Sequence, residues 1–281
     1  MSISHHADVQ LKKRTLAPLV AAAAMLVVAP ASANAAIKTG GSTGLQLLAQ
    51  KLANAYKAEK GVKVTVAGGG SGAGIKGAAS GKFDIGDSSR DPSAKDASGL
   101  WFTPVTREPF VVVVNPRNTV KSLTAAQIKS IFLGQTTKWS QLGWKNGGAI
   151  KVYSRIGTSG TLATFQKLFL DGAKVTSSAV QLPSNGLDRS RVAGNKDGIT
   201  FLTYQYVVGT TVVRPVKVGG ITGTLKNVLN GSYTYWSHQY FVTKGAPSGA
   251  VKTYIDWVRS SSGAAVVKRY AIPTTDPVKK T

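Results

Sequence analysis

Serine, threonine and glycine residues that could bind an anion recur in separate short segments of the chain. These are Ser42-Thr43, Ser71 after a run of glycines, Ser88-Ser89, and residues 158–161, which read Thr-Ser-Gly-Thr. Hydroxyl groups and the free N–H groups at the start of a helix donate hydrogen bonds, and glycine lets the backbone approach a ligand closely. Arg155 precedes the last segment, and its planar guanidinium could bind two oxygens at once. The pattern indicates a site for a small oxyanion, built from distant parts of the chain.

Two other interpretations of these segments are open. Each segment alone has the pattern of an ordinary helix N-cap. In addition, residues 72–77 spell G-x-G-x-x-G, the pattern of a dinucleotide site. That site needs an acidic residue at a strand end about 20 residues further on. Asp91 is near this spacing but follows a Ser-Ser-Arg turn, so the dinucleotide interpretation is not favoured.

Residues suited to acid–base catalysis are scarce. The chain has three histidines, of which His5 and His6 lie at its beginning and only His238 lies in the remainder. Its only glutamates are Glu59 and Glu108, and cysteine is absent. We therefore expect a binding protein and not an enzyme, with no catalytic residue, no metal site and no cofactor. The scarcity of histidine and glutamate argues in particular against a hydrolase that acts on phosphate esters.

The first 35 residues have the pattern of a secretory signal peptide. Lys12, Lys13 and Arg14 precede an apolar run, residues 16–28, that is too short to span a bilayer. Small residues follow, and we expect cleavage between Ala33 and Ala36. Without a cysteine there is no site for an N-terminal lipid anchor. These features predict a periplasmic protein that is not a lipoprotein.

The charge of the chain is strongly positive. It has 35 Lys and Arg against 12 Asp and Glu, a formal net charge of +23. Such a surface attracts anions of any kind. This leaves open an alternative function, in which an exported basic protein binds acidic polymers through its surface while its cleft is vestigial.

The order of the predicted elements indicates the fold class. β-branched runs such as residues 62–66 and 150–153 alternate with helix-like segments such as 45–58 and 161–170, separated by Gly- and Ser-rich turns. This alternation is typical of an α/β fold with mainly parallel sheets. Two further extended segments, 110–114 and 199–216, have the character of crossings between domains. We predict one lobe from residues 36–114 and 211–281, a second lobe from residues 115–210, and a cleft between them.

The segments taken together resemble the phosphate-binding proteins of bacterial ABC transporters, which are periplasmic substrate-binding proteins. The resemblance rests on residues 41–43, 68–76, 84–90, 111–116, 153–161 and 184–186, in that order along the chain. It implies a two-lobed periplasmic-binding-protein fold with two hinge crossings. It also implies that the chain holds inorganic phosphate, or a similar oxyanion, for delivery to an ABC permease. We further expect a monomer with no specific nucleic-acid partner.

The resemblance also implies which residues bind the anion. Carried over by position, they are Ser42, Thr43, Gly44, Ser71 and Ser89 from the first lobe, and Arg155, Ser159, Gly160 and Thr161 from the second. Ser89 stands where many relatives have an aspartate that accepts the proton of hydrogen phosphate, so Asp87, or else Asp84, is the candidate acceptor here. The acidic residue expected between Arg155 and Ser159 is missing. We therefore expect Arg155 to lack a local partner and the site to be more positive.

Overall fold

The computed structural model describes residues 1–2 and 36–281 of the chain. Apart from its first two residues, the predicted signal peptide lies outside the described residues. No helix in the described part of the chain is long and apolar enough to cross a membrane.

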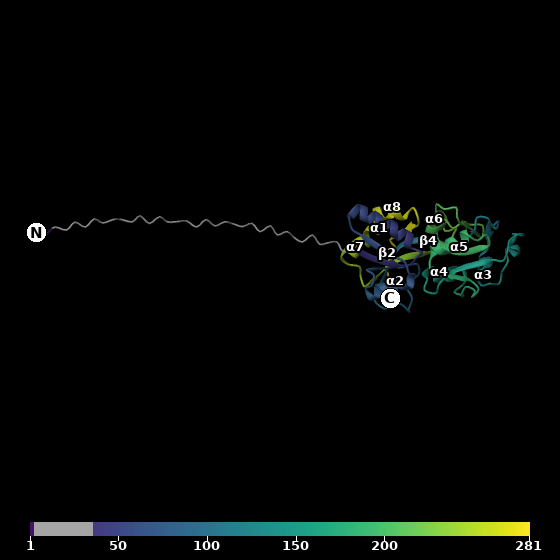
Figure 1. Cartoon of the computed structure of the whole chain (residues 1–281), viewed down its shortest axis with the longest axis horizontal. Coiled ribbons are helices and arrows are strands. Elements are labelled where there is room, and N and C mark those ends of the chain that lie inside the picture. The colour runs from purple at the N-terminus through teal and green to yellow at the C-terminus, as the bar shows by residue number, and fades with distance from the viewer. Residues whose placement is uncertain (3–35) are drawn as a thin grey trace. The chain divides into compact units, whose positions relative to one another are not determined.

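The strands follow one another across the molecule in the order β2-β1-β3-β11-β4-β8-β6-β7. Helices α1, α2, α7 and α8 lie around one half of this arrangement, and α3, α4, α5 and α6 lie around the other (Figure 1). The chain is therefore an α/β protein with two lobes, as predicted. The outer strands of each lobe pair in parallel, whereas β4 and β11 pair antiparallel with their neighbours. The sequence pattern did not predict these antiparallel pairs of strands.

The first lobe contains these elements: β1 (Ile37–Gly41), α1 (Gln46–Lys60), β2 (Val64–Ala67), α2 (Ser71–Ser80), β3 (Ile85–Ser88), β11 (Trp236–Lys244), α7 (Gly249–Arg259), α8 (Ser261–Val267), β12 (Ile272–Pro273) and β13 (Lys279–Lys280). Its main apolar cluster joins α1 to α7 and α8, with Leu48, Leu52 and Tyr254 fully buried. Tyr56 and Tyr254 pack edge to face within it, 4.9 Å between ring centroids. This packing holds the start of α1, and the turn before it, against the sheet.

The second lobe contains these elements: β5 (Ser122–Leu123), α3 (Ala125–Phe132), η1 (Trp139–Leu142), β6 (Lys151–Arg155), α4 (Gly160–Phe169), β7 (Val180–Leu182), α5 (Asn185–Ala193), β8 (Gly198–Thr203), η2 (Tyr204–Tyr206), β9 (Arg214–Pro215), β10 (Lys217–Val218) and α6 (Leu225–Leu229). Its core is aromatic, and Phe165 stacks on Phe201 with ring centroids 4.0 Å apart. Thr124 and Gln127 form a complete capping box that fixes the start of α3.

Strand β4 (Leu100–Val114) belongs to both lobes. Its first part pairs with β11, and its last residues, 110–114, pair with β8. At the point of crossing, the Phe110 N–H donates to the carbonyl of Tyr235, 2.9 Å away. The two segments that join the lobes are therefore hydrogen-bonded to each other.

Residues 211–235, which the sequence assigned to the first lobe, pack against elements of the second. β9 pairs with the end of β4, at Val113 and Val114. Val216, Val228 and Tyr233 are buried in the cluster that contains Phe132 and Phe165. The ladder between β11 and β4 begins at Trp236, directly after this segment.

Candidate anion-binding site

The predicted anion-binding residues lie where parallel strands end. Ser42, Thr43 and Gly44 follow β1, and Ser71 follows the glycines after β2 as the first residue of α2. Arg155 is the last residue of β6, and Ser159 is the N-cap of α4. In open α/β sheets ligands bind outside the carboxyl ends of the strands, because the loops there converge on one edge. All nine predicted residues, with Ser89, Gly160 and Thr161 included, are buried.

Ser88-Ser89 differs from the other segments because no helix follows it. The strand β3 continues to Ser88, and Ser89 begins an irregular loop. The expectation that each of these segments opens a helix is therefore wrong for this one. Ser89 presents its hydroxyl without a helix N-terminus behind it.

Hydrogen bonds join the three segments of the first lobe into one cluster. The hydroxyls of Ser42 and Ser89 share a short hydrogen bond, and the Ser89 N–H donates to Ser71 Oγ, 3.0 Å away. The Gly44 N–H lies 3.1 Å from Ser42 Oγ. The loops after β1, β2 and β3 are therefore held in fixed positions relative to one another.

The two lobes meet directly at this cluster. A Cβ atom placed on Gly44 would lie 2.6 Å from Thr161 Oγ1 and 2.7 Å from Ser89 Oγ, so any other residue there would displace these two hydroxyls. The Thr164 hydroxyl donates to the carbonyl of Ser89 over 2.7 Å, and the Gly72 N–H donates to that of Thr158 over 3.1 Å. Donors from the first and second lobes thus converge around Gly44.

Arg155 has an acidic partner after all, supplied by α5 and not by its own loop. Its Nε lies 3.2 Å from Asp188 Oδ2, and both side chains are fully buried. It also donates to the carbonyls of Leu182, 3.1 Å away, and Pro183, 2.6 Å away. Burial raises the pKa of Asp188 and lowers that of Arg155, and the attraction between the two charges opposes both shifts. The sequence offered Arg155 no local acidic partner, and the carboxylate that it meets in space lies 33 positions further along the chain.

Asn185, the first residue of α5, lies among the same donors. One of its amide atoms is 2.6 Å from Arg155 Nη1, and a guanidinium has only donors, so this atom must be the oxygen. The amide oxygen then also accepts from Gly44 N at 3.1 Å and from the hydroxyls of Thr43 and Thr161, each at 3.2 Å. Sequence reasoning included Asn185 in the family resemblance but gave it no role.

Gln239 on β11 is a second contact that sequence reasoning missed. The Ser89 hydroxyl donates to Gln239 Oε1, and Gln239 is fully buried. β11 lies more than 140 residues further along the chain, and it reaches Ser89 because it pairs antiparallel with β3. No local sequence pattern identifies such a partner.

The side chain of Asp87, the predicted proton acceptor, does not join this cluster. Its backbone carbonyl accepts from the Ser42 N–H at 2.9 Å, but the polar groups near its carboxyl are the hydroxyls of Thr39 and Tyr254. Burial raises the pKa of Asp87 to about 8, against the weaker opposite effect of Thr39. Asp87 lies within β3, where side chains alternate between the two faces of the sheet.

Residues at the end of β8 and in η2 form hydrogen bonds to the backbone of the loop after β1 and of the start of α1. The Thr203 hydroxyl donates to the Gly44 carbonyl at 2.8 Å, and the Tyr206 hydroxyl donates to the Thr43 carbonyl at 2.6 Å. Gln205 accepts from the Leu48 N–H at 2.9 Å. Gln205 is itself held by the buried Glu108 carboxyl on β4. We call Thr203, Gln205 and Tyr206 the corner clasp.

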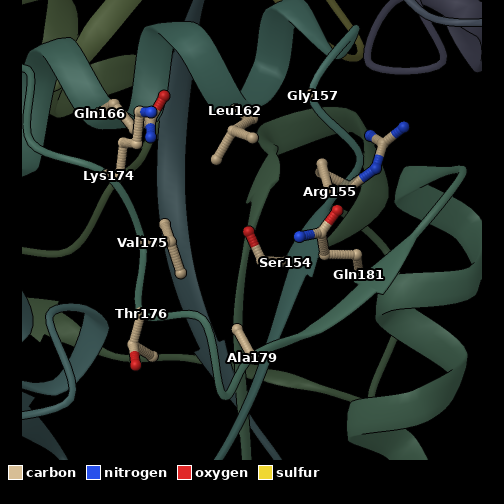
Figure 2. Close-up of a pocket in the computed structure, with 10 residues that line it drawn as sticks. All are labelled: Ser154, Arg155, Gly157, Leu162, Gln166, Lys174, Val175, Thr176, Ala179 and Gln181. Atoms are coloured by element: carbon tan, nitrogen blue, oxygen red, sulfur yellow. The ribbon is translucent and has the colours of Figure 1, made fainter.

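A separate pocket of about 280 Å³ lies in the second lobe beside α4, β6 and β7. Ser154, Gln166, Lys174 and Gln181 are among its polar lining residues (Figure 2). In Figure 2 the guanidinium of Arg155 points away from these side chains. Arg155 also lines this pocket, but Ser154 and Arg155 are consecutive in β6 and project to opposite faces of the sheet.

Known proteins resemble this chain in sequence and in fold. A family model described as a PBP superfamily domain matches residues 28–262. The phosphate-binding protein PstS of Bacillus subtilis is 28% identical over 95% of this chain and 96% of its own length.

Two solved structures are similar over nearly the whole described chain. A Clostridium perfringens protein, assigned as a phosphate ABC transporter substrate-binding protein and solved with bound phosphate, is 32% identical, with a TM-score of 0.80. An ABC-type phosphate transport receptor from Vibrio cholerae is 26% identical, with a TM-score of 0.67. In each case the alignment covers 85% of this chain and 100% of the solved one. The chain therefore belongs to the PBP superfamily and, within it, to the family of phosphate-binding proteins of bacterial ABC transporters.

Proposed function

We propose that this protein is exported, binds one inorganic phosphate ion between its two lobes and delivers it to an ABC permease in the membrane. The names of its relatives in Bacillus subtilis, Clostridium perfringens and Vibrio cholerae support this ligand and this transport role. We propose that it acts as a monomer, and by binding and not by catalysis. His238, on β11, is paired with Asp276 at 2.6 Å and is not among the clustered donors.

The observation that carries the proposal is the convergence of donors from both lobes around Gly44. In our proposal Thr43, Gly44 and Ser71 supply hydroxyl and amide hydrogens from the first lobe. Ser42 lines the site and donates its hydroxyl hydrogen to Ser89. Arg155 supplies the positive charge and Ser159, Gly160 and Thr161 supply further donors from the second. Hydrogen bonds between charged and polar partners are roughly twice as strong as neutral ones. A dianion buried among these donors is therefore bound strongly.

Ser89 is proposed as the acceptor for a proton on the bound ion, in place of Asp87. A hydroxyl has one hydrogen and two lone pairs, and the hydrogen of Ser89 is donated to Gln239. One lone pair of its oxygen accepts from the Ser42 hydroxyl, and the other is left for a proton on the ion. Phosphate carries at least one proton at neutral pH, whereas sulfate carries none. An acceptor at this position favours phosphate over sulfate.

We also propose a revised boundary between the lobes. The first lobe then consists of residues 36–109 and 236–281, and the second of residues 110–235. The burial of Val216, Val228 and Tyr233 in the aromatic core of the second lobe supports this division. Domain dissection at residue 235 should keep that core intact, whereas a cut at residue 210 removes part of it.

The proposed function is tested by calorimetry of the purified chain with phosphate and sulfate. We expect one phosphate per chain and much weaker binding of sulfate. The Gln239→Leu variant frees the Ser89 hydroxyl to donate, so the ratio of phosphate to sulfate affinity should fall by about tenfold. The matched control is Gln181→Leu, on the exposed face of β7 and away from the cluster, which should leave the ratio unchanged.

The absence of measurable phosphate binding by the unmodified chain would contradict the transport proposal. Equal binding of the two anions would contradict the role of Ser89 alone. Phosphate-ester hydrolysis by the purified chain would instead place it among enzymes.

A further inference from the structure

The amide oxygen of Asn185 collects more donors than it can satisfy. It lies within 3.2 Å of Arg155 Nη1, Gly44 N, Thr43 Oγ1 and Thr161 Oγ1. A neutral amide oxygen has two lone pairs, whereas an anionic oxygen can accept more bonds and gains more from each. The four donors, one of them a cation, are better matched to an oxygen of an anion than to Asn185.

These donors are also the groups that the proposed function assigns to phosphate. The Gly44 N–H and the two threonine hydroxyls each have a single hydrogen, so they cannot bond fully to the amide oxygen and to phosphate at the same time. Phosphate binding must therefore take these hydrogens from Asn185.

The backbone around Asn185 is fixed, so only its side chain can respond. Ser184 caps α5 by accepting from the Leu187 N–H at 3.1 Å, and the Asn185 N–H is directed at Thr43 Oγ1, 3.3 Å away. Rotation about the side-chain torsions can move the amide group without moving the helix. The competition between Asn185 and the ion is thus confined to one side chain.

We propose that Asn185 is a built-in competitor for phosphate, its amide oxygen occupying the position of one phosphate oxygen. This inference rests on the proposed function. Asn185 belongs to the second lobe, while Thr43 and Gly44 belong to the first, so the same contacts also hold the lobes together. Asn185 therefore stabilises closure without ligand and weakens the apparent affinity for phosphate.

Two substitutions separate this role from that of an ordinary ligand-binding residue. Asn185→Ala removes the competing oxygen, and phosphate binding should tighten by about tenfold. Asn185→Asp places a carboxylate beside Arg155, and phosphate binding should weaken by more than about 100-fold. Asn230→Ala and Asn230→Asp are matched controls, because Asn230 is exposed at the end of α6 and should leave binding unchanged.

The experiment is phosphate calorimetry on the full chain, with small-angle X-ray scattering in phosphate-free buffer and thermal unfolding to check that each variant is folded. We expect the Asn185→Asp variant to be compact without phosphate and the Asn185→Ala variant to be more expanded. Weaker or unchanged phosphate binding by Asn185→Ala would overturn the proposal. Unchanged binding by Asn185→Asp would do the same. If Asn185→Ala does not fold, Asn185→Ser takes its place with the same expected direction.

The two proposals fail in distinguishable ways. If the unmodified chain binds no phosphate, the proposed function is wrong. If it binds phosphate and only the Asn185 variants depart from expectation, the competitor role alone is wrong.

Discussion

Arg155 and Asp188 form the most deeply buried ion pair of the described residues, and each depends on the other. Taking a charge out of water costs several kcal/mol unless a partner compensates for it. Removing one member therefore leaves an uncompensated buried charge. The guanidinium is oriented by the carbonyls of Leu182 and Pro183, which accept from Nε and Nη2, and its Nη1 faces Asn185.

The Arg155→Ala substitution should lower the free energy of unfolding by about 3 kcal/mol and remove phosphate binding. The double variant Arg155→Ala with Asp188→Asn should recover most of the stability, because the orphaned carboxylate is gone, but none of the binding. Urea denaturation and calorimetry measure the two effects separately. Equal destabilisation in the single and double variants would contradict this account of the pair.

Among the elements, the corner clasp links the second lobe to the loop that begins α1. Its contacts are to the backbone carbonyls of Thr43 and Gly44 and to the Leu48 N–H. They orient the Gly44 peptide, whose N–H is one of the clustered donors. The corner clasp therefore orients the Gly44 N–H, although none of the clasp residues donates a hydrogen bond in the anion site.

The Tyr206→Phe substitution removes one clasp hydrogen bond, the one to the Thr43 carbonyl. A buried hydrogen bond of this kind contributes about 1 kcal/mol, so phosphate affinity should fall about fivefold. Tyr204→Phe on the same short helix is the control, because Tyr204 is only half-buried and its hydroxyl is not part of the clasp. Calorimetry of the two variants decides the matter, and similar losses in both would argue against a specific role of the clasp.

The turns that begin several helices could be predicted, because they carry local sequence patterns. The Gly- and Ser-rich turns precede α1, α2 and α4 because glycine and N-cap residues are local signals. Asp188 and Gln239 could not be predicted, since each meets its partner only through tertiary packing. Asp87 lies inside β3, and the direction of its side chain is set by the alternation of that strand.

At the scale of the whole molecule, buried carboxyl groups make stability depend on pH. Burial raises the pKa of Asp87 and of Glu108 to about 8, from ordinary values of 3.8 and 4.5, and in Glu108 the bonds from Gln205 act the other way. Each group is thus protonated in the folded chain over a range where it is ionised in the unfolded chain. Unfolding then releases protons, so stability falls as pH rises through this range.

We expect the free energy of unfolding to decrease between about pH 5 and pH 8, by up to about 1.4 kcal/mol per pH unit for each group. Below about pH 4 both states bind the proton, and above about pH 8 neither does, so these two groups should have little effect outside the range. The Glu108→Gln variant should show a shallower decrease. Urea unfolding at several pH values tests this, and a chain more stable at pH 8 than at pH 5 would contradict it.

The two-lobed arrangement could be predicted from the sequence. The segment by which the chain returns from the second lobe to the first could not. Residues 199–216 have the β-branched composition of a crossing strand, yet they divide into β8, the corner clasp and β9. The segment that does return is β11, which contains Trp236, His238 and Gln239, and nothing in its sequence indicated that it crosses between the lobes. Composition identifies a buried strand but not the lobe in which it is buried.

The hydrogen bond between Phe110 and Tyr235 ties together the two segments that join the lobes. Two strands bonded side by side resist sliding along their length, because sliding would break the whole ladder, but they can still bend and twist as one ribbon. The lobes can therefore swing apart and return without changing register. Each closure would then bring Gly44 back opposite Thr161. The connecting ribbon, and not the bound ion, therefore aligns the two halves of the site.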